Sequence, residues 1–441
     1  MKDRPDSIRS TNPEPTMMTT TAGAACDLAR RLDEVRAIRT DALSEDDLSV
    51  VEGKLREILA DLSTNGDANQ KTTQAWTNAG IFLATLLLQK GEEDATKEAS
   101  ALLSERGFAY RLSVESLKHN HSTPSNPPTR YSAAWDGILP HPLLHRLDAT
   151  FGPTSKFWER HDYSDGSGGK DPSPYFSYIV PINNNGASSA RPPTALDIII
   201  GKIQRQISEV FPDVNECKYC EWWAHCRPHS SGHQLHFDSD DEGRGGVRNP
   251  VCSTVINISA DVGMGGETLV TTQTSSGRAL ATKGWLCANK RNRLLVFRGD
   301  LLHGVVPGPR VAAARSNDDD GSEASKEASR DRRRVTFMIA FWKDICIQDK
   351  EGHGSARPFN RVAGEEWAKP LSEVIEGGGS GGEEEDDDDG GAQKAKDSFF
   401  QVPVWSDVDV EKNRANGASV KEIRKYKLAL PPYEDFFQFF S

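Results

Sequence analysis

Long apolar runs are missing from this 441-residue sequence, and cysteine is scarce. The most apolar stretch, residues 81–88, is far shorter than the roughly 20 residues that a membrane-spanning helix requires. Seven cysteines, an odd number spread over a long chain, do not provide the dense framework of a disulfide-stabilised domain. These absences argue against a membrane protein and against a disulfide-rich secreted one.

Basic charge is also in deficit, because the formal net charge is −12. This balance argues against nucleic acid or an anionic membrane as the main partner, since both need lysine and arginine to neutralise phosphates. The sequence shows no apolar stretch typical of a secretory signal at its start, and the acidic residues there argue against an import peptide. We therefore expect a reducing compartment, cytoplasmic or nuclear, with organellar import left open.

Composition changes several times along the chain, and these changes predict its organisation. Prolines and polar residues interrupt the apolar patterns, and a glycine-flanked acidic run follows them. We expect a disordered segment 1–26, a helical region 27–118, a linker 119–130, a principal domain 131–350 with a flexible insertion at 315–331, an extension 351–376, an acidic glycine-rich linker 377–397, and an aromatic segment 398–441 that packs on the core.

Periodicity predicts helices first and strands later. In the helical region, apolar residues recur every three or four positions, as on one face of a helix: Val51, Leu55, Ile58, Leu59 and Leu62. In the principal domain, segments rich in β-branched and aromatic residues follow two helix-like segments, which predicts an α+β sandwich or barrel. The helix-like segments are 135–158 and 195–211, and the strand-like ones are 219–227, 252–259, 267–272, 292–297 and 334–342.

The centre of the chain contains the triplet His236-Phe237-Asp238. With 11 His and 36 Asp in 441 residues, about one His-x-Asp pair is expected by chance, so the triplet alone proves nothing. On an extended strand, however, residues two apart project to the same side, about 6.6–6.8 Å apart along the chain. His236 and Asp238 could therefore reach one metal ion while Phe237 faces the other way.

A third ligand must come from elsewhere, and His303 is the candidate, because it follows the predicted strand 292–297. Two imidazoles and one carboxylate on one side of an ion leave its opposite side open. Non-haem Fe(II) oxygenases use this arrangement, in which co-substrate and O₂ take the free positions. The alternative is that His236 is a core histidine and His303 a loop histidine.

The last predicted strand begins with Arg334, Val335 and Thr336. Arg334 and Thr336 share one face of this strand, and a guanidinium with a hydroxyl two residues on can together bind a ligand carboxylate. The alternative is an ordinary exposed strand end. No other Arg-x-Thr or Arg-x-Ser pair begins a predicted strand after His303.

A second group has the residue types of a zinc site: Cys217, Cys220, Cys226 and His229. A structural zinc site usually pairs two chelating turns, whereas a predicted strand runs through the middle of this group. Buried, incidental thiols are therefore the default interpretation.

Four motifs together carry a family resemblance. The segment from about 221 to 342 resembles the catalytic core of the Fe(II)- and 2-oxoglutarate-dependent dioxygenases, most of all the prolyl 4-hydroxylase-type branch. The motifs occur in the family's order: "HFD" at 236–238, "GGET" at 265–268, "LLHGVVPG" at 301–308 and "RVT" at 334–336.

The resemblance implies a double-stranded β-helix, or jelly roll, with flanking helices. It implies that His236, Asp238 and His303 are catalytic and bind Fe(II), and that Arg334 and Thr336 bind 2-oxoglutarate. The implied reaction consumes 2-oxoglutarate and O₂, releases succinate and CO₂, and hydroxylates a C–H bond of a protein side chain or small molecule, with ascorbate as a further candidate cofactor. The alternative is a non-catalytic interaction protein that keeps the jelly roll.

Two departures from the family pattern affect the co-substrate site. His303 and Arg334 are 31 residues apart, more than is usual, which the polar insertion explains if it loops out. Prolyl hydroxylases also place tyrosines near the co-substrate, where this chain offers Asn257 and either Cys226 or His233.

The substrate is not determined by the sequence, and neither is the oligomeric state. Arg244 and Arg248 follow Asp238 in a Gly-rich loop, where they could meet an acidic substrate or simply face solvent. The helical region 27–118 is expected to cap the core rather than to form a separate recruitment domain.

Overall fold

The computed structural model describes most residues within 45–64, 74–117, 124–160, 177–182, 193–228, 232–240, 248–259, 265–308, 333–345, 356–358 and 392–408, and a few between 27 and 35. The predicted segments 1–26 and 315–331, the acidic run 377–391 and residues 409–441 lie outside these described residues. None of the described helices combines the length and the apolarity that crossing a bilayer would need.

The three longest described helices of the predicted helical region are α2 (Glu45–Thr64), α3 (Gln74–Lys90) and α4 (Glu93–Ser104). The predicted stripe on α2 is confirmed, since Val51, Leu55, Ile58 and Leu62 are buried and Leu59 is half-buried. A helix that is apolar all round must be covered on all sides. This applies to α3, whose residues from Ala79 to Leu88 are all buried.

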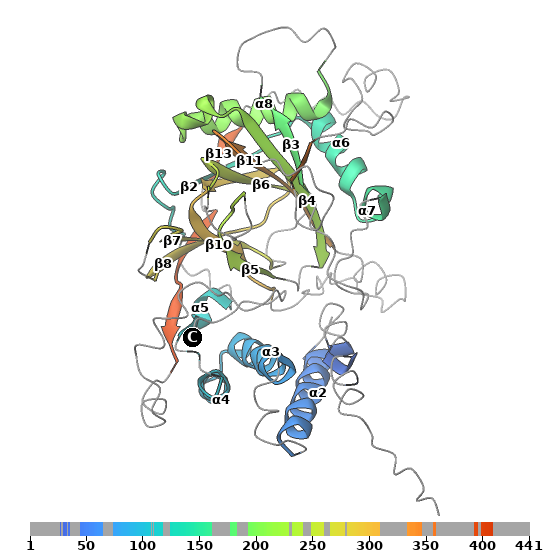
Figure 1. The fold of residues 1–441 in the computed structure, drawn as a ribbon, viewed down its shortest axis with the longest axis vertical. Helices are drawn as coiled ribbons and strands as arrows, with labels where there is room; N and C mark the ends of the chain where they lie inside the picture. Colours follow the sequence, from blue (N-terminus) through green and yellow to red (C-terminus); the bar gives the residue numbers. More distant parts are fainter. Residues whose placement is uncertain are drawn as a thin grey trace, which may run out of the picture.

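The larger sheet has eight strands and carries helices on its outer face (Figure 1). The covering elements are α6 (His141–Phe151), α7 (Lys156–Arg160), α8 (Ala195–Ser208) and the 3-10 helix η2 (Pro212–Glu216). The strands, in spatial order, are β12 (Ala356–Pro358), β3 (Ser177–Pro181), β4 (Tyr219–Pro228), β11 (Arg333–Trp342), β6 (Cys252–Ser259), β9 (Arg293–Arg298), β2 (Ser132–Asp136) and β13 (Gln393–Lys394).

The smaller sheet has five strands in the order β14 (Phe399–Pro403), β8 (Lys283–Cys287), β7 (Thr268–Thr274), β10 (Leu301–Val305) and β5 (His233–His236). From β4 to β11 the chain passes back and forth between the two sheets, and only β7 and β8 are consecutive in one sheet. Among the described strands of these two sheets, all pairings are antiparallel except that of β12 with β3. The predicted mixture of helices and short strands is confirmed, and the strands pair mainly antiparallel.

Figure 1 shows α3 and α4 on the side of the smaller sheet away from the larger one, with α2 beside α3. Their apolar side chains form one buried cluster with those of the sheet, including Leu235, Leu269 and Leu302. The Gln89 side chain donates a hydrogen bond to the Pro307 carbonyl at 3.2 Å. Two short elements, β1 (Tyr110–Leu112) and α5 (Val114–Leu117), follow these helices, and β1 pairs with β15 (Trp405–Asp407).

Strand alternation on β11 separates the apolar core from the interior between the sheets. Val335 and Phe337 belong to the cluster under α6 and α8. Their neighbours Arg334 and Thr336 must therefore face the smaller sheet, because successive side chains point to opposite faces. A separate apolar cluster, which includes Phe297 and Trp285, joins the two inner faces.

One element prediction is wrong: residues 135–158 do not form a continuous helical segment. Trp135 and Asp136 end strand β2, where Trp135 pairs with Leu294. Gly137 then has a φ of +67°, which favours glycine and ends the extended backbone, and α6 begins only after Pro140. The prediction also missed the short strands β5, β8 and β10, two of which carry site residues.

Candidate metal centre

Three predicted site residues converge between the two sheets. His236 is the last residue of β5, Asp238 follows it by two residues, and His303 lies in the middle of β10. His236 and His303 are direct cross-strand partners with ring centroids 4.3 Å apart. One potential ligand atom from each residue lies within 4.8 Å of the others, and the part of the chain that the structure describes contains no second such group.

A β-bulge gives β5 its unusual presentation of side chains. His303 pairs with His236, but Val305, two residues on, pairs with His233, three residues back, so β5 has one extra residue. The bulge allows the rings of both His233 and His236 to face the interior, with centroids 4.8 Å apart. Leu235 between them packs into the apolar cluster under the N-terminal helices.

Each imidazole is fixed by its own strand. Nδ1 of His236 is 2.9 Å from the Gln234 carbonyl, and Nδ1 of His303 is 2.9 Å from the Leu301 carbonyl. A carbonyl only accepts hydrogen bonds, so the proton is on Nδ1 and the lone pair is on Nε2. Both Nε2 atoms face Asp238 Oδ1, at 3.5 Å and 3.6 Å. Two ligands each about 2.1 Å from one ion are separated by about 3–3.5 Å, so these distances suit a shared cation.

Asp238 is held by residues outside the triplet. Ser253 on β6 donates a hydrogen bond from its hydroxyl to Oδ2 at 2.5 Å, which leaves Oδ1 directed at the imidazoles. The Asn249 amide donates to the Asp238 carbonyl at 2.6 Å, and Ser275 donates to the Asn249 side chain at 2.7 Å. The orientation of the Asp238 carboxylate therefore depends on Ser253 of β6, and the Asp238 backbone is held by Asn249, which precedes β6.

Electrostatics favours the cation-binding forms of two of these groups. Burial alone would raise the pKa of Asp238, but the electrostatic influence of His303 and His236 beside it and the hydrogen bond from Ser253 hold it well below its usual range. Burial lowers the pKa of His303 to about 4. Burial also acts to lower the pKa of His236, but Asp238 outweighs it through a hydrogen bond and its charge, and raises this pKa above its ordinary value.

We expect metal affinity to fall as the pH is lowered, because one group, His236, becomes protonated. Protonation of His236 occupies its Nε2 lone pair, so binding weakens about tenfold per pH unit below the raised pKa of His236. His303, with a pKa of about 4, stays neutral over this range. Mn(II) binding measured by calorimetry between about pH 8 and about pH 5 checks this. A pH-independent affinity, or loss of two protons per metal, would contradict it.

Removing the Ser253 hydroxyl is expected to weaken metal binding without removing a ligand. Ser253→Ala frees the Asp238 carboxylate to rotate, and loss of such a supporting hydrogen bond typically costs about 10- to 100-fold in metal affinity. Ser259→Ala is the matched control, because Ser259 lies on the same strand as Ser253 but its hydroxyl donates to the Arg333 carbonyl on β11. Equal Mn(II) affinities in the two variants would show that the Ser253 contact is unimportant.

The residues predicted to bind a co-substrate lie on the same inner face. Arg334 and Thr336 are both buried, and the Arg334 guanidinium donates a hydrogen bond to the Gly266 carbonyl at 2.5 Å. Asn257, the third candidate, is buried directly opposite Thr336 on β6. Gly266 has a φ of +78°, and a Cβ added there would meet Arg334 at 3.3 Å, which accounts for a glycine in the "GGET" motif.

The strand β4 corrects one candidate and adds another. Cys226 points into the apolar cluster beneath the helices, so it does not face the interior. Its neighbour His225 does, because it pairs with Thr336 and its ring centroid is 5.8 Å from that of His233. The two-residue alternation of "EWWAHCR" could have identified His225, since Trp222, Ala224 and Cys226 are the apolar, buried partners.

The remaining candidates are placed elsewhere. Cys217, Cys220 and Cys226 are buried free thiols, and no metal group among the described residues includes them. His229 and Arg244 lie outside the described residues. Arg248 forms ion pairs with Asp240 at 2.7 Å and Asp344 at 2.8 Å, so it braces the turn after Asp238.

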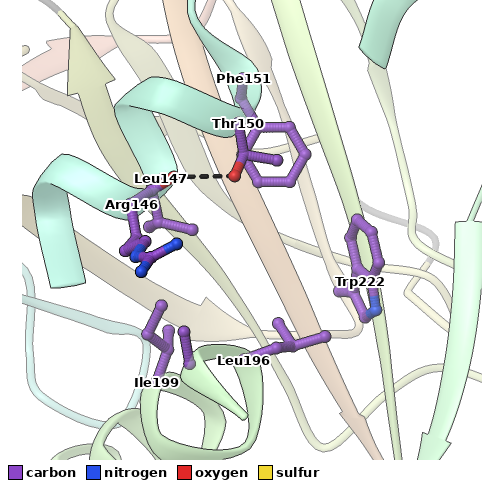
Figure 2. Close-up of a pocket in the computed structure, with 8 residues that line it drawn as sticks. Arg146, Leu147, Thr150, Phe151, Leu196, Ile199 and Trp222 are labelled. Carbon is purple, nitrogen blue, oxygen red and sulfur yellow. Dashed lines mark hydrogen bonds between the residues drawn. The ribbon is translucent and has the colours of Figure 1, made fainter. Parts of the chain in front are cut away.

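A hollow on the outer face of the larger sheet is separate from this centre. Figure 2 shows its lining by side chains of α6, α8 and β4, with Phe151, Leu196 and Trp222 among them. The Thr150 hydroxyl donates to the Arg146 carbonyl at 2.8 Å along one wall. Trp222 and His225 point to opposite faces of β4, so this hollow does not open onto the histidines.

No family model and no curated protein matches the sequence. Among solved structures, a prolyl-4-hydroxylase from Pseudomonas putida is 13% identical, over 54% of this chain and 99% of that one, with a TM-score of 0.26. EvdO2 from Micromonospora carbonacea var. aurantiaca is 11% identical over 50% and 92%, with a TM-score of 0.30. HygX from Streptomyces hygroscopicus, solved with iron bound, is 10% identical over 52% and 93%, with a TM-score of 0.26.

The matched structures also include a member of the 2OG-Fe(II) oxygenase family from Burkholderia pseudomallei, so they contain the class that the sequence motifs resemble. TM-scores for eight of the matched structures lie between 0.22 and 0.30.

Proposed function

We propose that this chain is an Fe(II)- and 2-oxoglutarate-dependent dioxygenase that hydroxylates a C–H bond. One observation carries the proposal: two imidazoles with protonated Nδ1 atoms direct their Nε2 atoms at a single carboxylate oxygen. The three residues come from two neighbouring strands and the turn after one of them, so their meeting depends on the fold. Chance spacing in the sequence does not account for it.

The donor set fits Fe(II). Two neutral imidazoles and one carboxylate, with no thiolate, form the facial triad of non-haem iron oxygenases and leave positions for further ligands. His236 and His303 would hold the ion through Nε2, and Asp238 through Oδ1. A three-ligand catalytic zinc site can use the same residue types. The buried Arg334 on the facing strand favours an oxygenase, because it provides a place for the distal carboxylate of 2-oxoglutarate.

The strand arrangement supports a jelly roll. The order β4-β11-β6-β9 at the centre of the larger sheet and β8-β7-β10-β5 in the smaller one results from a chain that winds between two facing sheets. We assign these eight strands to a double-stranded β-helix. The metal centre then lies on the inner face of the smaller sheet, and the candidate co-substrate residues lie on the inner face of the larger one.

In this proposal each side chain has a separate task. Bound Fe(II) would supply the redox chemistry that couples 2-oxoglutarate decarboxylation to C–H hydroxylation, with release of succinate and CO₂. Arg334 binds the distal carboxylate as a charged fork, and Thr336 and Asn257 contribute a hydroxyl and an amide beside it. Phe297, whose ring centroid is 4.4 Å from that of His303, provides an apolar wall that keeps water from the imidazole.

A non-catalytic interaction protein is not favoured, because all three metal ligands are present and oriented. The hydroxylated group, whether on a protein side chain or a small molecule, stays open, and so does prolyl specificity. The cytoplasmic or nuclear location remains a prediction from the sequence.

The direct test is succinate formation from 2-oxoglutarate with Fe(II) and O₂, with ascorbate added to keep the iron reduced. The wild-type protein is expected to form succinate even without a primary substrate, at a low rate that rises when the right substrate is supplied. Proline-containing peptides, free amino acids and cell extract form the first screen. The proposal fails if the iron-loaded wild-type protein neither binds 2-oxoglutarate nor forms succinate.

A further inference from the structure

Met338 on β11 is a buried apolar residue that lies outside the apolar core. It is 5% exposed, yet it is the one buried apolar residue in the described part of the chain that belongs to none of the four apolar clusters. Its strand neighbours Phe337 and Ile339 pack into the cluster under α6 and α8. Met338 therefore points the other way, into the space between the two sheets, because successive side chains of a strand alternate.

Along β11, Met338 lies midway between the two ends of the proposed site. The next inward position, two residues on, pairs with Ser253, whose hydroxyl holds the Asp238 carboxylate, so this is the metal end. Two residues back, Thr336 pairs with Asn257, which is the end proposed for the distal carboxylate. Each of these steps covers about 6.6–6.8 Å. The middle of a ligand that joins the two ends therefore passes over Met338.

The cross-strand partners of Met338 are apolar as well. Met338 pairs with Trp223 on β4 and with Val255 on β6, and Val255 pairs with Leu295 on β9. An apolar row on the inner face thus separates the metal end from the polar distal end. This order matches the chemistry of 2-oxoglutarate, in which two methylene groups join the keto-acid end to the distal carboxylate.

We propose that Met338 is a specificity residue that contacts these two methylene groups and sets the chain length of the keto-diacid. The inference rests on the proposed function and concerns the choice of co-substrate. A buried thioether outside the apolar clusters gains an apolar partner when the methylene groups lie against it. A diacid that is one methylene longer but held at the same two ends must bulge, and Met338 fills the space that the bulge needs.

A comparison of two keto-diacids tests the inference. 2-Oxoadipate has the same charged ends as 2-oxoglutarate and one more methylene group. Binding of both acids to Mn(II)-loaded protein is measured by calorimetry without O₂. The wild-type protein is expected to prefer 2-oxoglutarate by about 10- to 200-fold, the range for one methylene group in a fitted apolar pocket. Met338→Ala opens the space that the longer acid needs, and should reduce this preference by about tenfold or more.

Two further variants separate the pocket from the fold. Met338→Val removes less volume than Met338→Ala, so it should shift the preference in the same direction by a smaller factor. Ile339→Val shortens the neighbouring side chain, which packs on the opposite face of β11, and should leave the preference unchanged. Thermal unfolding without ligand identifies a variant that fails to fold, and Met338→Val carries the test if Met338→Ala does not fold.

Each outcome has one meaning. If the folded Met338 variants keep the wild-type preference, or if the wild-type protein binds both acids equally, Met338 does not set the chain length and the inference is wrong. In that case the proposed function still stands as long as the wild-type protein binds 2-oxoglutarate. If the Mn(II)-loaded wild-type protein binds neither acid, the proposed function itself fails.

Discussion

Replacing Asp238 with alanine is expected to abolish both Mn(II) binding and succinate formation. The change removes the ligand toward which both imidazoles point, and also the charge that raises the pKa of His236. Two imidazoles alone leave a weak, underspecified site. The loss should therefore exceed the roughly 100-fold that removal of a supporting hydrogen bond costs. Calorimetry with Mn(II) and a succinate assay with Fe(II) measure the two effects.

Asp344→Asn is the matched control for this prediction. Asp344 is an exposed aspartate that pairs with Arg248 beyond the turn that follows Asp238. This variant keeps the metal ligands and should bind Mn(II) as the wild type does. Thermal unfolding of Asp238→Ala checks that the fold survives. A folded Asp238→Ala protein with wild-type metal affinity or turnover would remove the basis for the proposed enzyme.

Replacing Arg334 with methionine is expected to raise the KM for 2-oxoglutarate by about 100-fold or more while leaving Mn(II) affinity unchanged. The change keeps much of the side-chain volume but removes a buried charge, and a hydrogen bond to a charged group contributes roughly 1.5–3 kcal/mol. A two-pronged carboxylate contact contains two such bonds. Arg334 is not among the clustered ligand residues, so metal binding should not depend on it.

The neighbouring Arg333 provides an internal control. It precedes Arg334 on β11 and pairs with Pro228. Its side chain therefore projects from the face of the sheet opposite to the one that carries Arg334. Arg333→Met should leave the KM for 2-oxoglutarate near the wild-type value. Similar KM increases in both variants would mean that general charge, and not the inward fork, attracts the co-substrate. An unchanged KM in Arg334→Met would place the distal carboxylate elsewhere.

The sequence was informative where local pattern and chemistry agree. The predicted strands 219–227 and 334–342 correspond closely to β4 and β11, because long runs of β-branched and aromatic residues suit a covered sheet. The helix around Val51 follows from its apolar period. The prediction of a helix-like segment 135–158 fails at its start, because Trp135 is apolar enough for either element and its pairing with Leu294 on β9 makes it part of a strand.

The short strands β5 and β10 could not be predicted with the same methods. The segment "HQLH" lacks the two-residue alternation of a regular strand. The bulge turns both His233 and His236 toward the interior, opposite to Leu235, although the two histidines are three residues apart. His303 looked like a loop residue after 292–297, although it lies within a strand that β7 and β5 flank. In both cases the pairing with a distant partner strand, and no property of the segment itself, makes the backbone extended.

The sequence by itself determined which chemical groups are available: two imidazoles, a carboxylate, and an arginine with a threonine two residues on. Only the tertiary structure decided that His236 and His303 are cross-strand partners, that Ser253 holds Asp238, and that Met338 pairs with Trp223. The physical reason is that strand register depends on hydrogen bonds and side-chain packing between segments far apart in the chain, whereas local residue patterns specify only which face of each strand is apolar.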